Sequence, residues 1–150
     1  MRAVIQRVSR ASVEIENKIV AKINIGLLIF IGIEVADDKE DSVWLANKIV
    51  NLRIFNDDNG IMNKSVKEID GDLQVVSQFT LHALTKKGNR PSYIHAAKGE
   101  FAEINYNLFV DQINMIFNKK IKTGKFGADM QIDFENDGPV TIIIDSKNKV

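Results

Sequence analysis

The chain has 150 residues, 45% of them hydrophobic, and its 20 basic and 20 acidic side chains cancel to a formal net charge of zero. Single domains typically have about 100–150 residues, so we expect one domain over residues 1–150, with about the last five residues frayed. Zero net charge argues against a protein that coats nucleic acid through bulk charge. The absence of cysteine excludes a disulfide scaffold, thiolate zinc sites and cysteine nucleophiles, and two histidines are too few for a histidine-rich metal cage. We expect neither a metal nor a cofactor.

The longest apolar run, Gly26–Ile33, has eight residues, whereas a membrane-spanning helix needs about 20. The N-terminus shows neither the apolar core nor the cleavage site of a signal peptide. We therefore expect a cytoplasmic protein with no membrane partner.

Strand patterns fill the first third of the chain, and a helix follows them. In an extended chain Val4, Gln6 and Val8 fall on one face and Ile5 and Arg7 on the other, and apolar and acidic residues alternate from residue 13 to 16. A turn at Asn17-Lys18 leads into a strand over Ile19–Ile25, and Gly26–Ile33 is apolar on both faces, as in a central strand. Asp37 or Asp38 can cap the helix that comes next. The expected stripe of that helix is Trp44, Leu45, Lys48, Ile49 and Leu52.

The second half predicts a strand over Leu73–Leu81 and a helix over His95–Asn118. The expected buried stripe of this helix is Phe101, Ile104, Leu108, Phe109, Gln112, Ile113, Ile116 and Phe117. Two further strands, Ala128–Phe134 and Val140–Asp145, are expected to flank a turn over residues 135–139. The pattern indicates an α+β fold, with a curled or barrel-like, antiparallel-rich β-sheet and two main helices packed on it.

The strand expected around residue 77 is polar where a buried strand is normally apolar. In extended backbone, Ser77 and Phe79 share one face, and Gln78 and Thr80 share the other. These polar groups either bond neighbouring backbone or line a ligand pocket, with Ser77 or Thr80 as a donor or nucleophile. His82 would share the face of Thr80, but alternate residues on a strand lie about 7 Å apart. A Thr80–His82 catalytic dyad is therefore disfavoured.

The Gly138-Pro139 bond stands between two expected strands. A trans bond in an ordinary turn is the common case, since only about 5–6% of such bonds are cis. A cis bond would present the flanking carbonyls as rigid acceptors, and glycine allows a ligand to approach the backbone closely.

Two small basic clusters either are solvated surface charge or contact phosphate. They contain Lys86, Lys87 and Arg90 in one loop, and Lys119, Lys120, Lys122 and Lys125 after the second helix. The acidic run between Glu34 and Asp41 is more typical of a solvated helix entry than of a metal site. The chain contains no glycine-rich phosphate loop, nucleophile elbow or zinc-ligand spacing.

Taken together, these segments resemble the D-aminoacyl-tRNA deacylase family. The two signature motifs of that family correspond to Ser77-Gln78-Phe79-Thr80-Leu81 and Asn136-Asp137-Gly138-Pro139-Val140-Thr141. Further matches, in the order of the family, are Ile5–Val13, Gly32–Glu34, Arg53–Phe55, Gly88–Ser92 and Thr123–Met130. The two signatures at this spacing are strongly specific. The family does not require a histidine at His82.

The resemblance implies a homodimer with its active sites at the interface. The residues implied to line the site for the charged 3′-terminal adenosine of aminoacyl-tRNA are Ser77, Gln78, Phe79 and Thr80. A cis Gly138-Pro139 motif would reach in from the partner subunit, with Arg7 holding its loop and Met130 packing nearby.

The implied activity is hydrolysis of D-aminoacyl-tRNA, and of glycine mischarged on alanine tRNA, as chiral proofreading in translation. Main-chain N–H groups at Phe79 and Thr80 would stabilise the oxyanion, the ribose 2′-hydroxyl would assist, and Thr80 would position the substrate. A wall at Gly138 and Pro139 would exclude an L side chain. Two alternatives stay open. One is a catalytically silent RNA-binding domain of the same fold, and the other is a related deacylase that edits an L-amino-acid error.

Overall fold

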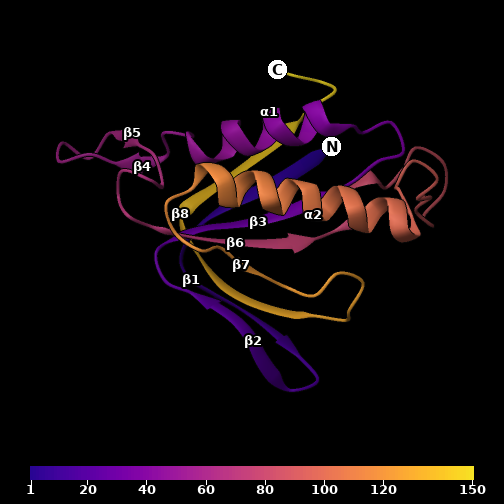
Figure 1. The fold of residues 1–150 in the computed structure, drawn as a ribbon, viewed down its shortest axis with the longest axis horizontal. Helices are drawn as coiled ribbons and strands as arrows, with labels where there is room; N and C mark the ends of the chain where they lie inside the picture. Colours follow the sequence, from indigo (N-terminus) through magenta and orange to yellow (C-terminus); the bar gives the residue numbers. More distant parts are fainter.

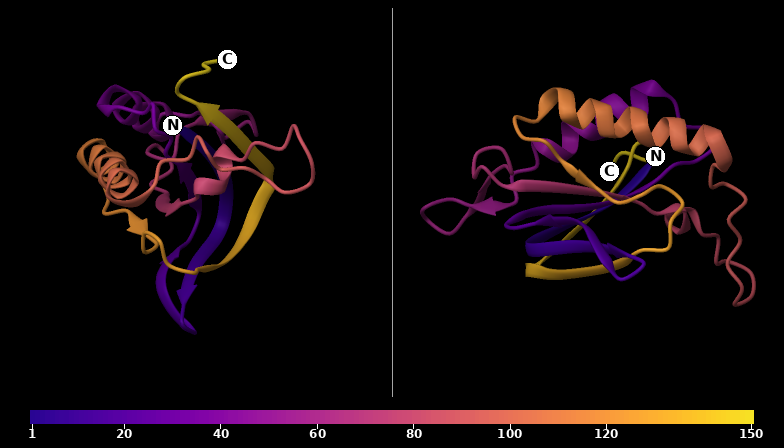
Figure 2. Two further views of the ribbon diagram at one scale, coloured as in Figure 1. Left: turned by 90° about the vertical axis from the view of Figure 1, so that its right-hand side faces the viewer. Right: turned by 60° about the horizontal axis from the view of Figure 1, so that its bottom comes forward.

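The computed structural model describes residues 1–150 and shows two helices on one face of a strongly curled sheet (Figures 1 and 2). The helices are α1 (Lys39–Val50) and α2 (Gly99–Ile116), with a short 3-10 helix, η1, at Phe79–His82. The strands are β1 (Arg2–Ile15), β2 (Lys18–Ile23), β3 (Gly26–Gly32), β4 (Phe55–Asn56), β5 (Met62–Lys64), β6 (Asp72–Ser77), β7 (Lys122–Thr123) and β8 (Gln131–Asp145). The expected α+β class, with two main helices on a barrel-like sheet, is confirmed.

The long strand β1 organises the sheet, whose order is β2-β1-β3-β6-β7 with β8 on the other edge of β1. Residues 2–8 of β1 pair with β3 and residues 11–15 pair with β2, all antiparallel. Strand β8 runs antiparallel to β1 along nearly its whole length. The register shifts between Val13 and Glu14 and again beside Arg7, and such bulges increase the twist that curls a sheet.

The parallel pairs β3–β6 and β6–β7 explain why both helices lie on the same face. Each parallel connection needs a crossover, and crossovers of one hand pack on one side of the sheet. Helix α1 lies in the first crossover and α2 in the second. A core of 23 buried residues fills the space between helices and sheet, and a cluster of seven lies on the opposite face. Neither helix combines the length and the apolar character needed to cross a membrane.

Helix α1 begins at one of the two N-cap residues expected from the sequence. Asp38 is the N-cap, its carboxylate accepts from the backbone N–H groups of Glu40 and Asp41, and Asp41 completes a capping box by accepting from the Asp38 N–H. The capping signal is readable from sequence because every partner lies within three residues.

The buried face of α2 differs from the expected stripe. Phe109, Ile113 and Phe117 are buried as expected, but Phe101 and Ile104 are 46% and 51% exposed. Ala102 and Tyr106, which were not in the expected stripe, are buried. The small side chain of Ala102 allows the first turn to pack closely, and the Tyr106 hydroxyl donates to the carbonyl of Val75 in β6 at 3.2 Å. The contact with β6 therefore sets the rotation of the helix.

Two strand predictions were wrong in their extent. The strand expected to reach Leu81 ends at Ser77, because its neighbour β3 ends at Gly32 and the last ladder bond runs from the Gln78 N–H to the Ile31 carbonyl. The chain then closes into η1, so the alternating faces inferred for residues 77–82 do not exist. In contrast, β8 is one continuous strand through residues 135–139, since β1 pairs with it on both sides of the unpaired residues 137–140.

Candidate functional site

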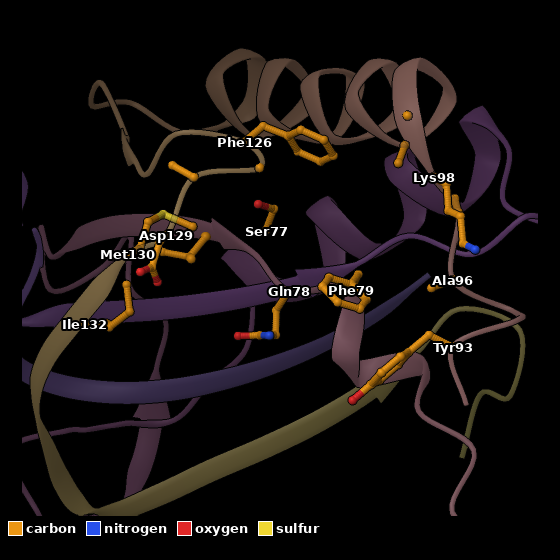
Figure 3. A pocket seen from close by; sticks show the side chains of 16 residues that line it. Ser77, Gln78, Phe79, Tyr93, Ala96, Lys98, Phe126, Asp129, Met130 and Ile132 are labelled. Atoms are coloured by element: carbon orange, nitrogen blue, oxygen red, sulfur yellow. The ribbon is translucent and has the colours of Figure 1, made fainter. Parts of the chain in front are cut away.

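A cavity of about 670 Å³ lies between the end of β6, the start of α2 and the loop that precedes β8 (Figure 3). Ser77, Gln78 and Phe79 line one side of it. Met130 lies on the side next to β8, and Phe126 lies between the sheet and α2, above Ser77 in the view. Of the four residues implied to line the site (Ser77, Gln78, Phe79 and Thr80), only Thr80 is not in direct contact with the cavity.

The rim of the cavity is aromatic. Phe79 is 55% exposed and packs edge-on against Tyr93, with ring centroids 5.1 Å apart and an interplanar angle of 76°. Exposed aromatic rings beside a cavity offer a surface on which a planar base can stack.

Helix η1 leaves two backbone donors free beside the cavity. The N–H groups of Leu81 and Ala83 donate to the carbonyls of Gln78 and Thr80, whereas no turn, loop or side-chain hydrogen bond uses the N–H of Phe79 or Thr80, the first two residues of η1. The first N–H groups of any helix lack an internal acceptor. Two adjacent free donors of this kind are suited to bind an anionic oxygen.

The side chains of the signature contain no activated nucleophile. The Thr80 hydroxyl oxygen accepts a hydrogen bond from the Gln78 amide at 2.6 Å. His82 is 4% exposed, and its Nε2 has no hydrogen-bond partner. Its Cδ2 atom packs on β3, 3.0 Å from where a Cβ on Gly32 would lie. The geometry therefore gives Thr80 no general base.

The second signature forms a bulge in β8 against a single residue of β1. Gln6 lies opposite Thr141, and Val8 lies opposite Asn136, so Arg7 alone faces residues 137–140. Within this bulge the Gly138-Pro139 peptide bond is cis, and both residues are exposed.

The side chain of Arg7 binds the bulge through Asp137. This Arg7 side chain is 9% exposed, and its Nε donates to the Asp137 carbonyl at 3.0 Å and lies 3.2 Å from the Asp137 carboxylate. Its Nη1 donates to the carbonyl of Ile54 at 2.7 Å. One guanidinium thus ties the bulge to the segment that follows α1.

Within one protomer the two signatures do not meet. Gly138 and Pro139 are absent from the lining of the cavity, whereas Met130, eight residues earlier than Gly138, is part of it. The cavity residues that sequence reasoning did not predict include the segment from Tyr93 to Ala102, which contributes Tyr93, Ala96, Ala97, Lys98, Gly99 and Ala102. No periodicity marks them, because the fold rather than the local pattern brings this segment beside β6.

The two basic clusters differ in how many of their charged side chains form ion pairs. Lys86, Lys87 and Arg90 are exposed and form no ion pair. Lys119 instead contacts Asp72 at 2.9 Å and Asp70 at 3.7 Å, and the hydrogen bond with Asp72 raises the pKa of its ammonium. The other three lysines of the second cluster, Lys120, Lys122 and Lys125, are exposed and unpaired. No group of three or more metal-ligating side chains comes together.

Comparisons with known proteins cover almost the whole chain. The family model described as D-Tyr-tRNA(Tyr) deacylase matches residues 4–145. The D-aminoacyl-tRNA deacylases of Flavobacterium psychrophilum and Flavobacterium johnsoniae are 64% and 59% identical, each over 99% of both chains. A solved structure titled c-Myc DNA Unwinding Element Binding Protein is 41% identical, with a TM-score of 0.92 over 97% of this chain and 98% of that one. A probable eukaryotic D-amino acid tRNA deacylase, 16% identical over 95% and 97% of the two chains, shares the fold with a TM-score of 0.80.

Proposed function

The chain belongs to the D-aminoacyl-tRNA deacylase family, a family of hydrolases, and from this premise we propose that it cleaves the ester bond of D-aminoacyl-tRNA in the cavity beside Phe79. The observation that carries this proposal is the pair of unused N–H donors at Phe79 and Thr80, at the edge of a cavity that Ser77, Gln78 and Phe79 line. An acyl ester gains negative charge on its carbonyl oxygen during hydrolysis, and fixed backbone donors stabilise that charge.

The proposed step adds water to the carbonyl carbon of the ester. The C–O bond to the ribose then breaks, the ribose oxygen leaves with a proton, and the products are the free amino acid and tRNA. The Phe79 and Thr80 N–H groups bind the oxyanion, and the substrate's own ribose 2′-hydroxyl assists the proton transfer. Thr80 serves to position the substrate, because its hydroxyl oxygen accepts from Gln78 and has no base beside it.

The aromatic rim provides a place for the 3′-terminal adenosine. The exposed ring of Phe79 and the half-buried ring of Tyr93 lie next to the proposed oxyanion donors. Stacking of a base on an aromatic side chain contributes about 1–3 kcal/mol and tolerates any base sequence. An adenine held there would direct its ribose ester toward Ser77 and η1.

We propose that selection against L-amino acids comes from Gly138 and Pro139 of a second subunit in a homodimer. In support, these residues are exposed, belong to a bulge that Arg7 holds from below, and are too far along β8 to line the cavity of their own protomer. A thousandfold preference needs about 4 kcal/mol of difference between the two barriers, which one steric clash with a well-held wall can supply. Glycine has no side chain to clash with Gly138 and Pro139, so glycine mischarged on alanine tRNA is also a proposed substrate.

The deciding experiment compares D-tyrosyl-tRNA with L-tyrosyl-tRNA under single-turnover conditions. We expect rapid hydrolysis of the D ester and near-absent hydrolysis of the L ester, and equal rates on the two would overturn the selection mechanism. In the same assay, Thr80→Ala is expected to retain turnover. Complete loss of turnover with substrate binding retained would make Thr80 a nucleophile instead.

A mixing experiment tests the composite site. One variant carries a bulky change in the cavity, Ser77→Trp, and the other carries Gly138→Val, so each homodimer is expected to be inactive. If the site is shared between subunits, unfolding and co-refolding the two together gives mixed dimers with one intact site and restores about a quarter of the wild-type activity, assuming random pairing. A co-refolded mixture that stays inactive would count against a shared site.

A catalytically silent nucleic-acid-binding role is the second candidate, because the solved structure at 41% identity is titled as a binding protein of a DNA element. Turnover separates the two roles, since a silent binder leaves both esters intact. A deacylase that edits an L-amino-acid error would hydrolyse the L ester faster than the D ester in the paired assay.

A further inference from the structure

Gln6 joins the two ends of the bulge that carries Gly138 and Pro139. Its side-chain oxygen accepts hydrogen bonds from the Asn136 amide, just before the bulge, and from the Thr141 hydroxyl, at 2.5 Å, just after it. No other side chain bonds to residues at both ends of this segment. The contact spans the four residues that face Arg7.

Asn136 passes this restraint to the inside of the bulge. Its side-chain oxygen accepts from the Val140 N–H at 2.9 Å, and its amide donates to the Val140 carbonyl at 3.1 Å. The Asn136 side chain thus replaces the strand partner that the bulge takes away from Val140. Since the same amide also donates to Gln6, the orientation of this clamp depends on the Gln6 oxygen.

Arg7 and the Gln6–Asn136 pair restrain the bulge in different directions. Arg7 donates to the Asp137 carbonyl, which fixes the distance of the segment from β1. Gln6 and Asn136 act at its two ends, which sets where Gly138 lies along the strand. Selection by steric exclusion needs both restraints, because a misplacement of about 1 Å can change a rate about a hundredfold.

We propose that Gln6 is a positioning residue for substrate selection, acting through Asn136 and Thr141 to fix Gly138 and Pro139 laterally. The inference rests on the proposed function for its catalytic consequence. The bracing itself is a property of the free protein.

The test uses the full-length protein and two variants at one position. Gln6→Leu keeps the approximate size of the side chain and removes the acceptor, whereas Gln6→Glu keeps an oxygen acceptor for both donors. We expect the ratio of D-tyrosyl-tRNA to L-tyrosyl-tRNA hydrolysis rates to fall about tenfold or more in Gln6→Leu, in line with the loss of interactions to two donors, and to recover largely in Gln6→Glu. Gln131→Leu is the matched control, because Gln131 lies on β8, is exposed and makes no side-chain hydrogen bond, and its ratio should not change.

Hydrogen exchange measured on the free protein provides a readout that does not depend on catalysis. The amides of Asp137, Gly138, Val140 and Thr141 should exchange about tenfold faster in Gln6→Leu, while those of the β3–β6 pair stay as in the wild type. If Gln6→Leu folds poorly, Thr141→Val removes one of the two hydrogen bonds at an exposed position, and a smaller change in the same direction is expected. An unchanged rate ratio and unchanged local exchange overturn the inference even when the wild type discriminates. Equal D and L rates in the wild type, with exchange that still depends on Gln6, overturn the proposed function alone.

Discussion

The guanidinium of Arg7 lies directly against Gly138, so that a Cβ at position 138 would come 2.9 Å from Arg7 Nη2. The same Cβ would also lie 2.9 Å from a side-chain carbon of Val140. The backbone of Gly138 has φ +130, a conformation that residues with a side chain rarely adopt. Position 138 therefore requires glycine both for space and for backbone conformation.

Gly138→Ala is expected to move the bulge, because neither Arg7 nor Val140 can retreat without losing its own contacts. We expect hydrolysis of the D ester to fall at least about a hundredfold, with a stability loss of about 1–3 kcal/mol from the strained backbone. Single-turnover assays and thermal melts measure the two effects. Gly60→Ala is the control, since Gly60 also has positive φ (+77) but nothing lies within 4 Å of its Cβ position. Gly60→Ala should lose stability but keep its activity. An equal loss of activity in both variants would contradict the steric argument.

Arg7→Lys should be far from conservative. The guanidinium bonds the carbonyls of Asp137 and Ile54 at once, and a lysine ammonium cannot span both with the same planar fork. We expect a stability loss of about 2–3 kcal/mol, because at least one buried carbonyl loses its donor, together with a lower D-to-L rate ratio. Denaturant unfolding gives the first quantity. Arg10→Lys is the paired control: the Arg10–Asp133 contact joins side chains that are 55% and 68% exposed, so a loss below about 0.5 kcal/mol is expected.

Gly124→Ala tests whether Met130 shapes the cavity. A Cβ at position 124 would lie 2.5 Å from the Met130 sulfur, and the next residue in reach, Val13, is 3.8 Å away. Because a methionine side chain rearranges easily, we expect it to turn into the cavity and raise KM about three- to tenfold with little change in stability. Adding Met130→Ala to this variant should lower KM again. A KM that stays at the wild-type value in Gly124→Ala would show that Met130 has room to move elsewhere.

Sequence reasoning succeeded where the deciding partners are local. The Asp38 cap needs only Glu40 and Asp41, and the resemblance of two short signatures was enough to predict the family. It failed where a distant element decides. The strand through Ser77 ends because β3 ends, and the packing of Tyr106 on β6 rotates α2 away from its expected stripe.

The candidate site was predictable in its signatures but not in its surroundings. The unused donors at Phe79 and Thr80 arise from the switch of strand to 3-10 helix, which an alternating pattern cannot reveal. Tyr93 comes to the rim from a loop with no periodicity. The cross-bulge role of Gln6 depends on a register shift in β8, so it too needs the three-dimensional pairing.

Lys86 in the basic loop and Lys119 in the second basic cluster should respond differently to substitution. Lys86 is exposed and unpaired, so we expect Lys86→Ala to weaken tRNA binding and to reduce the slope of log Kobs against log salt concentration by about 0.9 for a lost phosphate contact on a duplex. Lys119 is already held by Asp72, and Lys119→Ala should leave that slope nearly unchanged. Filter binding between low and moderate salt measures both, with Lys39→Ala, at the exposed start of α1, as the control. Equal slopes in all four proteins would remove the basic loop from the tRNA contact.

The contact of Asp41 with Lys147 should make stability fall in acid. Burial alone raises the pKa of Asp41, but its hydrogen bonds with Lys147, Ser146 and the Asp38 backbone outweigh burial and lower the pKa from 3.8 to about 2. A carboxyl whose pKa is lower in the folded state contributes stability above its unfolded pKa and loses that contribution as pH falls through the folded value. Wild type should therefore exceed Asp41→Asn by about 1–2 kcal/mol at pH 7, and the gap should shrink between pH 4 and pH 2. Urea unfolding at several pH values measures it. Asp58→Asn, at a side chain that is 98% exposed, should show no such gap, and a gap for Asp41→Asn that persists at pH 2 would mean that the loss comes from the shape of the cap and not from its charge.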